Sequence, residues 1–172
     1  MTPNPVIRLT GVVQTLEHVV FPAVDQSNSL AVEQCGLVLA QLKMLIGHLP
    51  WIGAYHQLCF DDVAATAEAL PAGAGGPATM GAAAAVAEAL AAARAQGDPL
   101  AGFHQIGTAI DDLLRAVAQD GGAEYRRSAE RTIFAFSQRQ SLRSRSWFRE
   151  AGFDPAPSSV PDYAEMIAGA SA

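Results

Sequence analysis

The sequence predicts an all-α fold, a helical bundle of about six helices arranged as up-and-down hairpins. Apolar residues recur at intervals of three and four along most of the chain, which is the period of an amphipathic helix. Residues that cap or break helices separate these segments. The breaks fall at Asn4-Pro5, Ser27-Asn28, Leu49-Pro50, Asp98-Pro99 and Gly121-Gly122.

Residues 28–49 are predicted to form the central helix of the bundle. A broad apolar face covers most of the circumference of this segment, and a second, narrower stripe consists of Leu30, Leu37 and Met44. A helix with two apolar faces needs neighbours on two sides, so we expect the other helices to surround it.

The other helices follow from the same spacing. An amphipathic helix is expected from Pro5 to Pro22, and another follows Pro50. After a Gly- and Pro-rich loop over 71–79, residues 82–96 are nearly all alanine, which favours a helix that packs close to a neighbour. Two more helices start at Asp98-Pro99 and after Gly122, and the last ends at Gly152. We therefore expect one domain over 1–155 and a tail over 156–172 with a short docking helix.

Two segments resemble each other and suggest an internal duplication. Pro50–Leu58 and Pro99–Ile106 both read proline, two residues, glycine, an aromatic residue, His, Gln and an aliphatic residue, with one extra Ala in the first copy. Eight matched positions are few, so chance similarity is a serious alternative. If the duplication is real, His56 and His104 occupy equivalent positions near helix starts and face one cleft.

Composition restricts the class of protein. Of the 172 residues, 50% are hydrophobic and 16% are charged, which is typical of a folded domain. The net charge of −6 makes nucleic acid an unlikely partner. No uninterrupted apolar run approaches the roughly 20 residues of a membrane span, so no membrane contact is expected. Two cysteines on apolar helical faces are typical of a reducing compartment, and a cytoplasmic location is predicted.

The basic residues are concentrated in the last long helix. Seven of the eleven Lys and Arg residues lie between Arg126 and Arg149. Arg143 differs from most of them because its position falls on the apolar side of that helix. A guanidinium there must reach water or find an anion. The candidate partners of Arg143 are a bound ligand anion and two carboxylate pairs of the chain itself, Asp61-Asp62 and Asp111-Asp112.

Three polar residues interrupt the apolar surface of the central helix. Gln34, Gln41 and His48 are spaced by seven and therefore stack along one line. Polar groups in an apolar arc must be hydrogen-bonded, hydrated or used for binding. Bonding across the bundle or at its edge is the simpler interpretation, and a polar cavity between helices is the alternative.

Motifs for catalysis and metal binding are not found. The sequence contains no nucleophile elbow, phosphate-binding loop, dinucleotide fingerprint or Glu-x-x-His pair, so it assigns no catalytic residue and no cofactor. One set has ligand chemistry without a recognised spacing: His56, Cys59, His104 and Asp111. Each of these has an ordinary role as a core polar group or a surface charge, so no metal ligand is assigned.

The sequence therefore favours a cytoplasmic, non-enzymatic binding module for a partner chain or a small acidic ligand. The alternative is a metal- or ligand-dependent enzyme that uses His56, His104 and nearby carboxylates. Phe134 and Phe148 fall outside the core arc of the last helix, which favours a homodimer or a partner protein at this C-terminal helix. The candidate ligand-binding residues are Gln34, Gln41, His48, His56, His104, Asp111 and Arg143.

Overall fold

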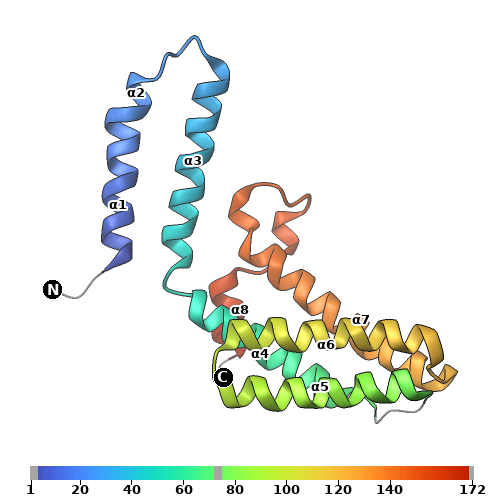
Figure 1. Ribbon diagram of the computed structural model, residues 1–172. Helices are drawn as coiled ribbons and strands as arrows, with labels where there is room; N and C mark the ends of the chain where they lie inside the picture. The colour runs from blue at the N-terminus through green and yellow to red at the C-terminus, as the bar shows by residue number, and fades with distance from the viewer. Residues whose placement is uncertain (1–3, 72–74, 171–172) are drawn as a thin grey trace. The chain divides into compact units, whose positions relative to one another are not determined.

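A computed structural model describes residues 4–71 and 75–170 and confirms the all-α fold. Within these residues the only β pairing is an isolated bridge between Gly75 and Gly121. Figure 1 shows the order of the elements: α1 (Pro5–Thr15), the π-helical turn η1 (Leu16–Val20), α2 (Phe21–Ala23), α3 (Ser29–His48), α4 (Ile52–Ala69), α5 (Pro77–Gln96), α6 (Pro99–Asp120), α7 (Ala123–Trp147), the short 3₁₀ turns η2 (Arg149–Ala151) and η3 (Pro157–Ser159), and α8 (Tyr163–Ala170).

The chain forms two compact units, where the sequence led us to expect one domain over 1–155 with a tail over 156–172. The first unit contains Met1–Ile52 and Trp147–Val160, and the second contains Gly53–Ser146 and Pro161–Ala172. The tail therefore supplies residues to both units.

The first unit is built on a helical hairpin. Figure 1 shows α1 and α3 lying side by side and running in opposite directions. Asn4 caps α1, since its Oδ1 accepts from the backbone N–H groups of Val6 and Ile7 at 3.0 and 3.3 Å, and Asn28 caps α3 through the N–H of Ala31. A 2.9 Å salt bridge from Lys43 to Glu17 joins α3 to η1, the π-helical turn that continues α1. Local caps thus set where both helices begin.

Helix α3 forms where predicted, but within the first unit it is not enclosed by other helices. His48 is its only buried residue. One face packs toward α1 and is half-buried, whereas Leu30, Leu37 and Val38 are 65%, 43% and 50% exposed. The expectation of a central position was wrong because the hairpin supplies α3 with one neighbour, which leaves the second apolar stripe uncovered.

The same helix has the length and composition of a membrane span. Of the helices in 4–71 and 75–170, α3 alone is long and apolar enough to cross a bilayer, with a mean hydropathy of 1.4. None of the 18-residue window of α3 that has this hydropathy is buried in the protein. The sequence contains no uninterrupted apolar run here, because Glu33 and Lys43 interrupt the segment, although its average hydropathy stays apolar.

The core of the second unit lies among α4, α5, α6 and α7. Its fully buried side chains are Val63, Ile106, Leu113 and Val117, joined by Ala93 and Ala129. Helices α5 and α6 pack along their length (Figure 1). Gly102 lets α6 approach α4, because a Cβ at this position would lie 2.7 Å from the ring of Phe60.

A tertiary contact caps the start of α5. The residue before the helix, Gly76, provides no side-chain cap. Instead, the carboxylate of Asp120 at the end of α6 accepts from the backbone N–H groups of Ala78 and Thr79, each at 2.9 Å, and from the Thr79 hydroxyl at 2.6 Å. The Thr79 hydroxyl holds the pKa of Asp120 below its usual value, because it stabilises the ionised carboxylate.

Helix α8 lies where the sequence places a short docking helix. Its Tyr163 and Ile167 are buried in the structure. The Ser146 hydroxyl donates to the carbonyl of Pro161 at 2.9 Å, which joins the end of α7 to the segment before α8 within the second unit.

Candidate functional site

A buried polar cluster between α4 and α7 contains one of the predicted site residues, Arg143. This side chain is almost fully buried, at 7% exposed. Its Nη2 lies 2.7 Å from Oδ2 of Asp62, and its Nη1 donates to Oε1 of Gln140 at 3.1 Å. Of the anions that the sequence offered, the structure therefore pairs Arg143 with the Asp61-Asp62 site.

A second arginine shares the same carboxylate. Arg139 lies one helical turn before Arg143, and its Nε donates to Oδ1 of Asp62 at 2.9 Å. Its Nη2 lies 3.5 Å from the hydroxyl of the buried Thr66. Arg139 is half-exposed, whereas Asp62 and Arg143 are largely withdrawn from water. The cluster thus holds two guanidinium groups on one carboxylate, with the more solvated arginine at its edge.

Two weak acids complete the cluster, and both are neutral near pH 7. Burial raises the pKa of Tyr55 to about 12, although a hydrogen bond with Ser144 and the charge of Arg143 oppose the shift. Burial also raises the pKa of the Cys59 thiol, which lies 3.8 Å from Nε2 of Gln140. A protonated thiol is a weak nucleophile, so the cluster has the chemistry of a buried structural network.

The three polar residues aligned on α3, Gln34, Gln41 and His48, lie in different environments. Gln34 and Gln41 are exposed, and Gln34 borders a small apolar cavity of about 160 Å³ between the helices of the hairpin. His48 is buried and stacks on Trp147, with ring centroids 4.1 Å apart and an interplanar angle of 29°. The three residues therefore do not line one polar cavity together.

The burial of His48 predicts a pH dependence for the first unit. Burial lowers the pKa of His48, and the charge of Glu150 offsets this only in part. Below about pH 6.5 His48 takes up a proton in the unfolded chain but not in the folded unit, because its pKa is lower in the folded unit. The contribution of neutral His48 to the free energy of unfolding is therefore fully present above about pH 6.5 and is lost as the pH falls through the lowered pKa. We expect urea unfolding followed by tryptophan fluorescence to show this loss. A His48→Phe variant keeps the stacking and should lose the dependence, whereas an unchanged profile in that variant would contradict the assignment.

The other predicted residues lie on α4 and α6. His56 is half-buried on α4, whereas His104 and Asp111 are exposed on α6. Within 4–71 and 75–170, no group of three or more His, Cys, Asp or Glu side chains is arranged to hold a metal ion.

The two similar segments use their glycines differently. Gly102 is buried against Phe60 and Ala93, whereas a Cβ at Gly53 would meet nothing within 4 Å. His56 and His104 also differ in burial. The matched order of residues therefore does not correspond to matched packing, and the internal duplication stays a prediction.

Two structural features were not assigned from the sequence. Tyr125 is a buried residue of α7, and nothing in the helical spacing showed that its hydroxyl faces a cavity of the second unit. Arg139 carried no signal either, because it lies directly between Gln138 and Gln140 in a run of polar residues. Its contact with Asp62 depends on how α4 and α7 align, which spacing within one helix does not reveal.

Comparison of the chain with protein-family models, curated proteins and solved structures finds no match in any of the three.

Proposed function

We propose that the protein is a helical binding module that dimerises through its N-terminal hairpin. The observation that carries this proposal is the uncovered face of α3. We define the α3 seam as the exposed residues Leu30, Gln34, Leu37, Val38, Gln41 and Leu45.

The seam has the spacing of a coiled-coil interface. Leu30 and Leu37 alternate with Gln34 and Gln41 at intervals of four and three, which is the a/d pattern of a heptad repeat. Val38 and Leu45 flank this pattern and widen the apolar surface. Dimerisation would bury the leucines of both copies and so remove their apolar surface from water. The glutamines at the a positions would favour one alignment of the two helices over others.

A second copy of the hairpin fits this surface better than a lipid bilayer does. Identical helices place Gln34 and Gln41 opposite amide groups that can donate and accept, which satisfies polar groups that hydrocarbon would leave unpaired. The charge of the hairpin also favours a second copy over a bilayer. Residues 5–48 carry two basic residues, Arg8 and Lys43, against three acidic ones, so they lack the basic excess that attracts anionic lipids.

The proposal moves the dimer contact that the sequence placed on the C-terminal helix. Phe134 and Phe148 are indeed 65% and 54% exposed. Apart from Leu142 and Phe153, they are the exposed large apolar side chains in this part of the chain, whereas the α3 seam repeats regularly over several turns of one helix. The small acidic ligand has less support, because Arg143 is engaged by Asp62 and Gln140. A cytoplasmic location stays a prediction.

We expect Leu37→Glu to abolish dimerisation. In a two-fold dimer the substitution buries carboxylates in an apolar seam, which should weaken association at least about 100-fold, or roughly 3 kcal/mol. Because Leu37 is exposed in the single chain, the fold should survive, and circular dichroism checks this. Light scattering should give twice 18.0 kDa for the wild-type chain and 18.0 kDa for the variant.

Phe134→Asp and Phe148→Asp are the matched controls, because they place the same charge on exposed apolar sites of the C-terminal region. Both should remain dimeric. A monomer with either control but not with Leu37→Glu would return the contact to the C-terminal helix. A wild-type chain that is monomeric at all concentrations, or that floats with neutral phosphatidylcholine vesicles, would overturn the proposal.

A further inference from the structure

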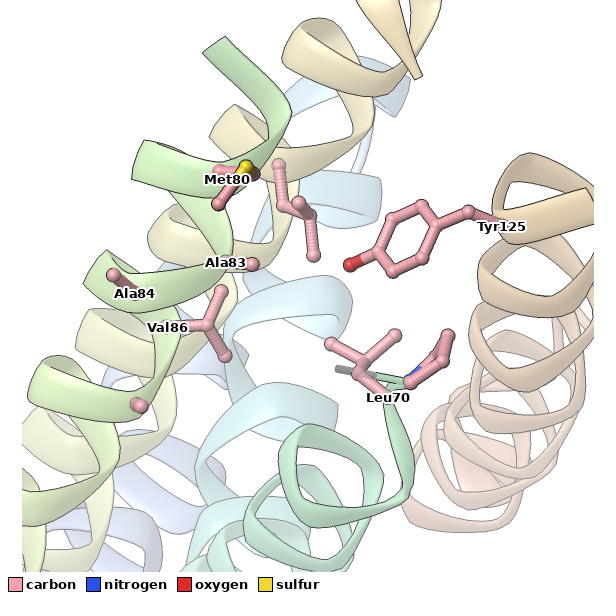
Figure 2. Close-up of a pocket in the computed structure, with 9 residues that line it drawn as sticks. Leu70, Met80, Ala83, Ala84, Val86 and Tyr125 are labelled. Carbon is pink, nitrogen blue, oxygen red and sulfur yellow. The ribbon is translucent and has the colours of Figure 1, made fainter. Parts of the chain in front are cut away.

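The second unit contains an apolar cavity that the proposed dimer does not use. Its volume is about 300 Å³, and it lies among the end of α4, the first half of α5, and parts of α6 and α7 (Figure 2). Val86, Leu113 and Tyr125 are buried and form its inner part, whereas Met80 is 57% exposed and borders its opening. The cavity is therefore open to solvent on one side and apolar inside.

The alanine-rich sequence of α5 explains why this space exists. Helix α5 turns Ala83, Ala84 and Ala87 toward the cavity, where longer side chains would fill the gap to α7. Alanine gives the highest helix propensity but buries little surface. A segment that looked like simple low complexity thus forms one wall of a cavity.

One polar group faces this space. Tyr125 is 4% exposed, and Figure 2 shows its hydroxyl directed into the cavity from α7. Among the residues that the structure describes, none forms a hydrogen bond with this Oη atom. Burial raises the pKa of Tyr125, so the phenol stays protonated near neutral pH and can donate. Buried hydroxyl groups are normally bonded, so this donor is suited to a bound acceptor.

We infer that the cavity is a binding site for a small, neutral, largely apolar molecule with one hydrogen-bond acceptor. The described side chains that line it carry no charge, so a charged ligand would lose hydration without a counter-charge. An apolar cavity of about 150 Å³ accepts benzene, so one of roughly twice that volume suits a bicyclic molecule. This site lies in the second unit and does not depend on the hairpin dimer.

Two probes of equal shape test this inference on the full chain. The ketone 1-indanone carries one acceptor, and indane is its hydrocarbon counterpart. Methyl NMR of labelled methionine gives a local reading, because Met80 borders the cavity while Met44 lies in α3 and Met166 in α8. We expect 1-indanone to shift the Met80 resonance in a saturable way and to leave those of Met44 and Met166 in place.

Tyr125→Phe removes the hydroxyl and keeps the ring. The substitution should reduce the affinity for 1-indanone about five- to tenfold, which corresponds to the loss of one hydrogen bond, and should leave the affinity for indane unchanged. Ala84→Leu, at an exposed position on the cavity wall, should block both probes without affecting folding. Three results would overturn the inference: no saturable shift of the Met80 resonance, an equal loss of affinity for both probes in Tyr125→Phe, or parallel shifts of all the methionine resonances.

The two proposals can fail separately. A chain that is monomeric but still binds 1-indanone would contradict the proposed dimer and leave the cavity proposal standing.

Discussion

Asp62→Asn is expected to destabilise the second unit by about 3–5 kcal/mol. The substitution removes the only carboxylate that contacts Arg143 in the described chain, and that guanidinium is 7% exposed. The guanidinium of Arg143 then remains buried without a counter-charge, and an unpaired buried charge lowers the free energy of unfolding strongly. Urea unfolding followed by circular dichroism measures the loss.

The partners of Asp62 should not contribute equally. Arg143→Met leaves the carboxylate paired with Arg139, so the expected loss is smaller, about 1–3 kcal/mol. Arg139→Met removes a half-exposed partner and should cost less than about 1 kcal/mol. Combining Asp62→Asn with Arg143→Met should recover part of the stability lost in Asp62→Asn. Equal losses for Asp62→Asn and Arg139→Met would contradict this account of the cluster.

Gly102→Ala is expected to destabilise the second unit by about 1–3 kcal/mol, although alanine has the higher helix propensity. The added Cβ would lie 2.7 Å from Cε2 of Phe60 and 3.1 Å from Cβ of Ala93. Either the ring of Phe60 moves or α6 shifts away from α4, and both disturb the core. Hydrogen exchange of α6 amides should show faster opening in the variant.

Gly107→Ala is the matched control for this prediction. It lies in the same helix, five residues later, and its added Cβ would meet nothing within 4 Å. Without a clash, the higher helix propensity of alanine should stabilise the unit by roughly 0.5–1 kcal/mol. If both substitutions changed the unfolding free energy in the same direction, close packing at Gly102 would not be the cause.

Part of the candidate site was predictable from one helix at a time. The apolar side of the last helix included Arg143, and the sequence named the Asp61-Asp62 pair as one source of its counter-ion. Helical periodicity reports the direction in which a side chain points, so it identified an arginine that needed an anion. It could not choose between the two aspartate pairs, because that choice depends on which helices are neighbours.

The sequence by itself determined the helices and most of their starting points. Asn4, Asn28 and Asp98 accept hydrogen bonds from backbone groups two or three residues ahead, so these caps depend only on nearby residues. Gly152 adopts the predicted left-handed conformation at φ +79°, which depends on its own lack of a side chain. Such features depend on nearby residues rather than on contacts between distant parts of the chain.

The tertiary structure decided which faces are covered and which distant groups meet. Helix α5 receives its cap from Asp120, more than forty residues away. The apolar stripes of α3 gave no sign of which one would lack a neighbour, and the alanines of α5 gave no sign of the cavity beside them. Burial and long-range hydrogen bonds depend on how helices align, and that alignment follows from the packing of many side chains at once rather than from the period of any single helix.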